Sequence, residues 1–273
     1  MRVQRRPVLV LHDEPRLHQR VRSLPPQEFE YRAVQGWSDL IAQVEEAPPS
    51  ALVVVGPYVG THPRLGIAPE LQTLLLEFPS TAVIAALEVS EGAGGDLKLL
   101  GKLGVVDVIS LGHDDTLQAM VARFRTSQGA PLRALLEQVL PAELPGRARA
   151  ILDAAAAVVA VSGGASDLAG RLGLSRRTLL RWCLRAGLPP PRRLLAWMRI
   201  LLAAEMLDDR GRRVLSVAQA TGYSSDSGLR RVMLTFVGSN PSALRKRGAF
   251  AAAAKQFLRE LSRHRSRSAR ERH

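Results

Sequence analysis

Cysteine is nearly absent from this chain of 273 residues, in which Cys183 is the only one. A single cysteine excludes a disulfide within the chain and a zinc site built from cysteines. Long apolar runs are missing too, because the longest, Ala154–Val161, is far shorter than the roughly 20 residues of a membrane-spanning helix. The apolar run after the basic start ends at His12, which is not typical of a signal peptide. We therefore expect a cytoplasmic protein with no membrane partner.

Patterns typical of catalytic sites are missing as well. No nucleophile is paired with a base in the sequence, and the histidines lack the spacing of metal ligands. The histidines are His12, His18, His62, His113, His264 and His273. The segment Gly92–Gly95 has neither the ending of a phosphate-binding loop nor the spacing of a dinucleotide-binding turn, so we expect a flexible turn. We expect no enzyme activity, no metal and no cofactor; an enzyme with its site in the N-terminal half is the remote alternative.

Acidic residues are scarce in the second half of the chain. Residues 141–273 carry 25 Lys and Arg but only 9 Asp and Glu, whereas residues 1–140 carry 13 and 16. The formal net charge of +13 therefore belongs to the C-terminal half. Together with the length, this asymmetry predicts two domains, one of which binds a polyanion. A basic surface that is merely solvated is the alternative.

The N-terminal half alternates short apolar runs with segments of helical spacing. We expect strands at residues 7–12, 28–34, 51–55, 81–87 and 105–111. We expect helices at residues 15–24, 38–46, 70–78, 96–103 and 115–125, the second of them capped by Ser38. Strands that alternate with helices predict an α/β domain, in which a five-stranded parallel sheet is covered on both faces.

The ends of these strands carry a further pattern. Asp13 and Glu14 follow the first strand, and Gly104 and Asp107 lead into the fifth with Gly-x-x-Asp-x-apolar spacing. In these features and in size the domain resembles a response-regulator receiver, which is flavodoxin-like in fold. The resemblance implies a phosphate-accepting aspartate at the end of the third strand, but that strand runs into Gly56 without a carboxylate.

Other parts of the receiver chemistry are missing. The lysine that follows strand five in receivers would fall at Leu111 or Gly112, and neither is basic. Without these partners, two carboxylates at a strand end are more typical of a solvated turn than of a Mg²⁺ site. We therefore expect a pseudo-receiver that is not phosphorylated in the usual way. The loop Gly56–Pro69 lies where open parallel sheets bind ligands, and we favour an inert or protein-contacting loop over a ligand site.

One short pattern occurs twice in the C-terminal half. The first copy is Leu168-Ala169, Gly173-Leu174-Ser175, Leu179, Arg181 and Cys183. The second copy is Val217-Ala218, Gly222-Tyr223-Ser224, Leu229, Arg231 and Met233. The two glycines lie 49 positions apart. The alanine of each copy lets two helices approach closely, and the glycine ends the first helix because it adopts the left-handed conformation without steric cost.

The second helix of each copy follows directly. Ser175 in the first copy, and Ser224 or Ser225 in the second, can cap this helix. The apolar pair four residues apart faces inward, which leaves Arg181 and Arg231 on the exposed faces. Two helices joined by a tight glycine turn, with an outward arginine on the second, predict a helix-turn-helix whose second helix enters the major groove of DNA.

The same stretch resembles the two-helix-turn-helix DNA-binding domain of AraC/XylS-type transcription regulators. The family's second motif has the form Gly-aromatic-Ser-x-x-Ser-x-apolar-x-Arg, followed by Gly-x-x-Pro-x-x-apolar-Arg. It stands here as Gly222-Tyr223-Ser224-Ser225-Asp226-Ser227-Gly228-Leu229-Arg230-Arg231, then Gly238-Ser239-Asn240-Pro241-Ser242-Ala243-Leu244-Arg245. The resemblance covers roughly residues 145–250. As departures, Cys183, Leu229 and Met233 stand where the family usually has phenylalanine, and Leu234 and Thr235 where it often has lysine.

The resemblance implies that both second helices reach adjacent major grooves on one face of double-stranded DNA, about 34 Å apart. It places Arg177, Leu180, Arg181, Asp226, Ser227 and Arg231 against bases. Arg176, Arg185 and Arg230 are better placed to contact phosphates. Arginine can form two hydrogen bonds to guanine, whereas Leu180 can contact only a thymine methyl. Asp226 either accepts from cytosine or caps its helix, and we expect Trp182 and Leu184 in the core.

These patterns divide the chain into four segments. Residues 1–128 form the receiver-like domain, 129–146 the linker, 147–250 the DNA-binding domain, and 251–273 a helical extension and basic tail. Within the DNA-binding domain, a helix at residues 192–207 joins the two motifs. The stretch from Arg259 onward holds six arginines and little that could pack, so we expect it to lack stable structure.

We therefore expect a sequence-specific DNA-binding transcription regulator, nucleoid-associated in a bacterial cytoplasm. Its partner is double-stranded DNA, and RNA polymerase and a second copy of the chain are further candidates. The N-terminal domain would mediate regulation or dimerisation without phosphorylation. The alternative among nucleic-acid-binding proteins is a nonspecific architectural DNA binder, which would show a shallow sequence preference and a steep dependence on salt.

Overall fold

A computed structural model of the protein describes residues 5–62, 66–89 and 94–270, with side chains as far as residue 266. The chain divides into two compact units. One consists of Met1–Pro131 with Asp209–Gly211, and the other of Leu132–Asp208 with Arg212–His273. None of the helices in the described residues combines the length and the apolar character needed to cross a membrane.

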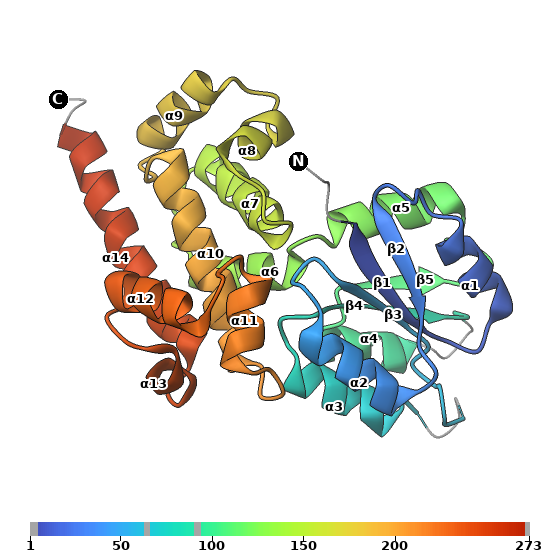
Figure 1. Ribbon diagram of the computed structural model, residues 1–273. Helices are drawn as coiled ribbons and strands as arrows, with labels where there is room; N and C mark the ends of the chain where they lie inside the picture. Colours follow the sequence, from blue (N-terminus) through green and yellow to red (C-terminus); the bar gives the residue numbers. More distant parts are fainter. Residues whose placement is uncertain (1–4, 63–65, 90–93, 271–273) are drawn as a thin grey trace. The chain divides into compact units, whose positions relative to one another are not determined.

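The first unit is built on a five-stranded parallel sheet (Figure 1). Its strands are β1 (Arg6–Leu11), β2 (Phe29–Ala33), β3 (Leu52–Val55), β4 (Ala82–Leu87) and β5 (Asp107–Ser110). They lie in the spatial order β2-β1-β3-β4-β5, and every pairing is parallel. This is the doubly wound order of flavodoxin-like folds, and it confirms the predicted α/β class.

Helices cover both faces of this sheet. They are α1 (Pro15–Arg22), α2 (Trp37–Glu46), α3 (Pro69–Glu77), α4 (Gly94–Leu103) and α5 (Leu117–Thr126). Because successive side chains of a strand point to opposite faces, β1 contributes to two cores. Leu9 and Leu11 pack with α2, α3 and α4, while Val8 and Val10 pack with α1 and α5. Every residue of β1 after Arg6 is apolar and buried, which is the pattern that identified this strand in the sequence.

The start of α2 differs from the sequence expectation. Ser38 was expected to cap this helix, but the N-cap is Gly36, and Ser38 lies in the first turn. The side chain that satisfies a backbone donor here is that of Asp39, whose Oδ2 accepts a hydrogen bond from the N–H of Gln35 at 3.2 Å. An acidic residue in the first turn also favours the helix dipole, so this start is stabilised without a capping serine.

Two loops expected from the sequence are described only in part. Gly92 and Ala93 of the expected glycine turn lie outside the described residues, whereas Gly94 begins α4. In the loop expected at Gly56–Pro69, residues 63–65 lie outside the described residues. The described part of this loop contains no helix or strand before α3, which begins at Pro69.

The second unit is entirely helical where the structure describes it, as predicted (Figure 1). Its helices are α6 (Ala130–Val139), α7 (Gly146–Ala160), α8 (Ala165–Arg171), α9 (Arg176–Arg185), α10 (Pro191–Asp208), α11 (Val214–Ala220), α12 (Asp226–Val237), α13 (Pro241–Arg245) and α14 (Ala249–Arg270). The first residues of α6, Ala130 and Pro131, are counted with the first unit. Helix α6 lies within the segment 129–146, and Leu132, Leu136 and Leu144 of this segment are buried in the core of the second unit.

Helix α10 lies at the centre of this core. It packs against α7 and α14, and Leu194, Met198 and Leu201 are fully buried. The ring of Trp197 meets Phe236 of α12 at a centroid distance of 4.9 Å and Phe257 of α14 at 5.6 Å. Because α10 is held on several sides, the helix that joins the two motifs is fixed in the core.

Helix α14 continues to Arg270, so the expectation that the chain lacks structure from Arg259 onward is wrong as far as Arg270. Phe257 and Leu261 are 0% and 2% exposed and belong to the core. The first turn of α14 is also anchored, because the carboxylate of Asp208 accepts hydrogen bonds from two of its N–H groups, at 2.6 and 2.8 Å. Residues 271–273 lie outside the described residues.

Candidate nucleic-acid interface

The first motif consists of α8, a tight turn and α9. Gly173 has a φ of +65°, the left-handed conformation that glycine adopts without steric cost. The N–H of Leu174 donates to the carbonyl of Ala169 at 2.8 Å, which closes the end of α8. Ser175 then caps α9, because its Oγ accepts from the N–H of Thr178 at 3.1 Å. The left-handed glycine and the serine cap were both expected from the sequence.

The second motif repeats this geometry with α11 and α12. Gly222 has a φ of +87°, and the N–H of Tyr223 donates to the carbonyl of Ala218 at 2.8 Å. The sequence left Ser224 and Ser225 open as the cap of α12. The cap is Ser225, whose Oγ accepts from the N–H of Gly228 at 3.2 Å. Both motifs are therefore built in the same way, with one extra residue in the second turn.

The inward faces of α9 and α12 are anchored by equivalent pairs. Leu179 and Cys183 on α9, and Leu229 and Met233 on α12, are all 0% exposed. Burial raises the pKa of the Cys183 thiol to about 12, so this side chain behaves as a small apolar group. Cys183, Leu229 and Met233, which stand where the domain that this stretch resembles usually has phenylalanine, belong to the common core.

The outward faces carry the side chains expected to contact bases. Arg177, Arg181 and Arg231 are exposed, and none is paired with a carboxylate in the described residues. Leu180 is 41% exposed on α9, and Ser227 is exposed on α12. Arg181 and Arg231 occupy equivalent helix positions, two residues after the first residue of each buried pair. These side chains are free to meet a ligand that approaches both helices.

The remaining expected contacts differ in their surroundings. Arg176, Arg185 and Arg230 are exposed, and the guanidinium of Arg176 donates to the hydroxyl of Ser166 on α8. Asp226 is half-buried in the first turn of α12, where Ser225 provides the cap, so the carboxylate of Asp226 is not the capping group.

One matched pair of leucines on this surface was not expected from the sequence. Leu184 was expected in the core, but it is 46% exposed, and the equivalent Leu234 of α12 is 49% exposed. Each lies three residues after the outward arginine of its helix and therefore on the same face. The signal was in the sequence, because Leu184 directly follows Cys183, and a helix turns by about 100° per residue. Trp182 is half-buried against the core, with the guanidinium of Arg147 at 4.5 Å from its ring centroid.

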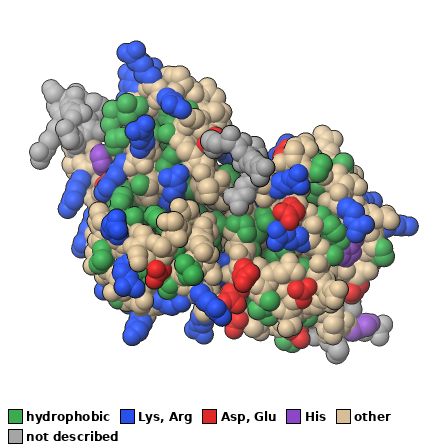
Figure 2. Space-filling view, viewed as in Figure 1, with side chains coloured by type: hydrophobic (Ala, Val, Ile, Leu, Met, Phe, Trp, Pro, Cys, Tyr) green, Lys and Arg blue, Asp and Glu red, His purple; other side chains and the backbone are tan. Residues whose placement is uncertain are grey.

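Figure 2 shows many Lys and Arg side chains, and few Asp and Glu, on the helical unit. The two motifs are joined within this unit by α10, whose 18 residues form one uninterrupted helix. In Figure 1, α9 and α12 lie toward opposite ends of α10. Helices α9 and α12, which both carry exposed arginines, are therefore connected through one continuous helix, α10.

At the carboxyl end of the parallel sheet, the position that follows β3 is crowded. A Cβ at Gly56, directly after β3, would lie 3.0 Å from the imidazole of His12 and 2.9 Å from Val59, so an aspartate there would collide with both. The His12 Nε2 is 3.0 Å from the carbonyl of Ala86 on β4, which fixes the ring over this position. Burial lowers the pKa of His12, which favours the neutral ring.

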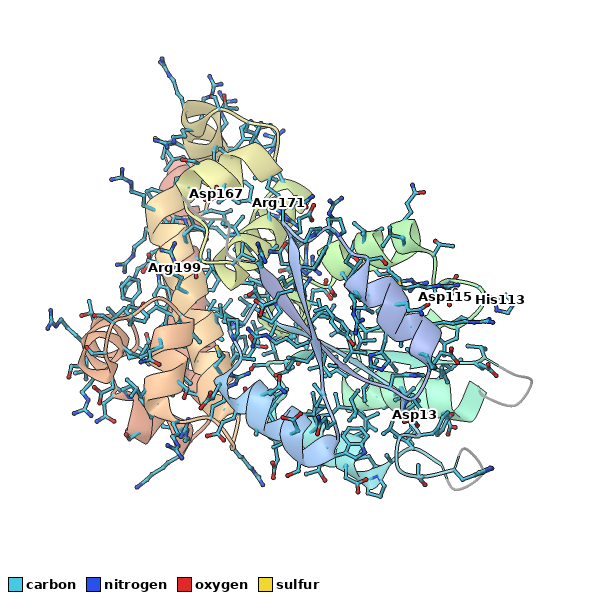
Figure 3. The ribbon with its side chains drawn as sticks, turned by 45° about the vertical axis from the view of Figure 1, so that its right-hand side comes forward. Asp13, His113, Asp115, Asp167, Arg171 and Arg199 are labelled. Carbon is cyan, nitrogen blue, oxygen red and sulfur yellow. The ribbon has the colours of Figure 1, made fainter. Side chains whose placement is uncertain are left out.

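The acidic residues Asp13, Glu14 and Asp115 at this end of the sheet do not form one cluster. Glu14 caps α1 by accepting from the N–H of Arg16 at 3.1 Å. Asp115 forms an ion pair with Arg20, which lowers the pKa of Asp115 although burial alone would raise it. Figure 3 shows Asp13 well apart from Asp115. No group of three or more His, Cys, Asp or Glu in the described parts of the chain could hold a metal ion.

A family model described as a helix-turn-helix domain matches residues 168–247. The match begins within α8 and ends just after α13, so it includes both turns, both outward arginines and all of α10. It supports an AraC-type DNA-binding domain and, with it, a DNA-binding transcription regulator of a generally non-enzymatic kind. No curated protein and no solved structure matches the chain.

Proposed function

We propose that the protein is a sequence-specific transcription regulator whose helices α9 and α12 enter adjacent major grooves on one face of double-stranded DNA. The observation that carries this proposal is the equivalence of Arg181 and Arg231. Both arginines are exposed, both lack a carboxylate partner in the described residues, and both stand opposite a buried apolar pair. A solvated basic surface would not require the same position on both helices.

The length of α10 supports simultaneous binding by both helices. Its 18 residues span about 27 Å at 1.5 Å per residue. Successive major grooves on one face of DNA are about 34 Å apart. Because α9 and α12 lie toward opposite ends of α10, a helix of this length is of the same order as the distance between two neighbouring grooves. Because α10 is buried in the core, it fixes the separation between α9 and α12, whereas a flexible linker would leave that separation variable.

In this arrangement the outward side chains divide into two roles. Base edges are contacted by Arg177, Leu180, Arg181, Asp226, Ser227 and Arg231, and phosphates by Arg176, Arg185 and Arg230. Arginine paired with guanine O6 and N7 contributes about 1–3 kcal/mol of discrimination. The exposed Leu184 and Leu234 add an apolar surface beside each arginine, which suits the methyl group of thymine.

For the first unit we propose a regulatory or dimerisation role that does not use phosphorylation of the receiver type. The crowded position of Gly56 and the absence of a metal cluster in the described residues support this part. Incubation of the full chain with acetyl phosphate and Mg²⁺, followed by intact mass measurement, should show no stable phosphoryl adduct. An adduct mapped to Asp13, Asp114 or Asp115 would refute it. Measurement of the solution mass would show whether a second copy binds.

Selection from a pool of random duplexes tests the proposed function directly. We expect an enriched site with two blocks of conserved bases, centred about 10–10.5 base pairs apart. A nonspecific architectural protein, which the abundance of arginine also suits, would enrich no sequence. Its binding would differ little between the selected duplex and a scrambled one.

A further inference from the structure

A groove in the second unit lies between the two parts of the first motif and the beginning of α10. It encloses about 640 Å³ and is lined by Arg176 of α9, Arg192 and Arg199 of α10, and apolar side chains that include Leu180 and Leu195. We propose that this groove holds the sugar–phosphate backbone of the DNA strand that flanks the first recognition helix. In this arrangement α10, which joins the motifs, contacts DNA itself through Arg192 and Arg199.

The charge of the groove fits a polyanion. None of its three arginines is paired with a carboxylate in the part of the chain that the structure describes. Asp167 lies nearby on α8, but it accepts from the N–H of Gly164 at 2.7 Å and does not line the groove. Three cations that converge on one groove repel each other unless an anion lies between them.

Arg199 is held in place for such a contact. Its Nη2 donates to the carbonyl of Gly163 at 2.7 Å, which occupies part of the guanidinium and orients the rest. The label in Figure 3 marks it on α10. Burial raises the pKa of Tyr223, and the charge of Arg199 acts against that rise, so Arg199 is also close to the turn of the second motif.

The apolar part of the groove distinguishes DNA from a protein segment as the occupant. Leu180, Pro190 and Leu195 can pack against deoxyribose, whose ring carbons are apolar, while the arginines contact the phosphates. The groove also shares Arg176 and Leu180 with the surface proposed to contact DNA. An acidic protein segment in the groove would therefore have to leave before DNA could bind, whereas a DNA strand that enters the major groove at α9 continues directly past it.

The inference rests on the proposed function, and the dependence of DNA affinity on salt tests it. The full chain is compared with Arg192→Ala, Arg199→Ala and Arg199→Lys between about 50 and 200 mM salt, on the selected duplex and on a scrambled one. Each alanine variant should reduce the slope of log affinity against log salt by about 0.9, as expected for one lost phosphate contact. The ratio of affinities for the two duplexes should stay unchanged, and Arg199→Lys should keep most of the slope.

Lys255→Ala provides the matched control. Lys255 is an exposed residue of α14 that does not line the groove, so its substitution removes one positive charge at a site outside the groove. Its slope should equal that of the unaltered chain. Within the described residues Arg192 makes no hydrogen bond, so its substitution removes none. A changed salt slope for Arg192→Ala therefore does not reflect unfolding. Unchanged slopes for Arg192→Ala and Arg199→Ala overturn the inference even if the protein binds its site. If no sequence preference exists, the proposed function fails, but the slope on the scrambled duplex still tests the groove.

Discussion

Arg193 of α10 and Glu260 of α14 form an ion pair through two hydrogen bonds, from Nε to Oε1 and from Nη2 to Oε2, each 2.9 Å long. The same guanidinium lies 4.1 Å from the ring centroid of Phe236 on α12. Arg193 thus connects α10 with both α12 and α14. Helix α14 lies outside the segment that matches the helix-turn-helix family, yet it packs against α10 and also contacts α9 and α12. The relative placement of α9 and α12 therefore depends on a helix beyond the matched segment.

Glu260→Gln should lower the melting temperature of the protein. The substitution removes the charge of a pair that is partly exposed, so we expect a loss of about 1 kcal/mol or less in the free energy of unfolding. Glu143→Gln is the control, because Glu143 is exposed and has no ion-pair partner in the described residues. Equal melting temperatures for Glu260→Gln and the unaltered chain would show that the pair contributes nothing.

The same pair should respond to acid. Burial alone would raise the pKa of Glu260, but the bonds and charge of Arg193 outweigh it and lower the pKa below 4.5. The unfolded chain then binds a proton at a higher pH than the folded chain does. This contribution to stability is present above about pH 4.5 and is lost as the pH falls through the lowered pKa. The loss should be smaller in Glu260→Gln.

Arg181→Ala and Arg231→Ala should each reduce sequence discrimination without affecting folding. Both side chains are exposed, so the melting temperature should stay the same. The loss of a two-bond contact to guanine should cost about 1–3 kcal/mol, which is roughly 5-fold to 150-fold in the affinity ratio of the selected duplex to one altered at that base. Gel-shift titrations measure this ratio. Discrimination that survives in both variants would contradict the base-contacting role.

Two nearby glycines should respond in opposite directions to alanine. Gly173 has a φ of +65° in the turn of the first motif, so Gly173→Ala should cost about 1–2 kcal/mol of stability. Gly170 lies within α8 with open space at its Cβ position, so Gly170→Ala should gain about 0.5–1 kcal/mol. Denaturant unfolding of the two variants measures both changes. A Gly173→Ala variant as stable as the unaltered chain would mean that α8 does not end in a left-handed turn.

His12 should make the first unit sensitive to acid. Because burial lowers its pKa below 6.5, the unfolded chain takes up a proton at a higher pH than the folded chain does. The stability that follows from this difference is present above about pH 6.5 and is lost as the pH falls toward the lowered pKa. Titration of the imidazole by NMR should give a pKa below 6.5 for His12, with exposed His113 as reference. A pKa at or above 6.5 would contradict the partly buried placement of the ring.

Several parts of this structure could be predicted because their signals are local. Short apolar runs identified the strands, since β3 and the part of β1 after Arg6 are buried on both faces and carry only apolar side chains. The turn glycines Gly173 and Gly222 adopt a conformation that few other residues tolerate, so their spacing showed where each motif bends. The inward pairs were clear from their spacing of four residues.

Other parts depend on contacts between residues far apart in the sequence. The helical state of α14 follows from the burial of Phe257 and Leu261 and from the bond between Glu260 and Arg193, which lie 67 residues apart. The arginine-rich sequence of α14 does not show by itself that the rest of the second unit offers a surface against which this helix can pack. Leu184 was assigned to the core for its residue type alone, although its position places it beside the outward arginine.

Binding to duplexes with altered spacing tests the central claim most directly. The selected site is compared with versions in which about 5 or about 10 base pairs are inserted between its two blocks. Because α10 is one buried helix, it cannot follow either change, and both insertions should reduce the affinity to that of a duplex with a single block. Affinity that is unchanged by the 5-base-pair insertion, which turns the second block to the opposite face of DNA, would contradict the account.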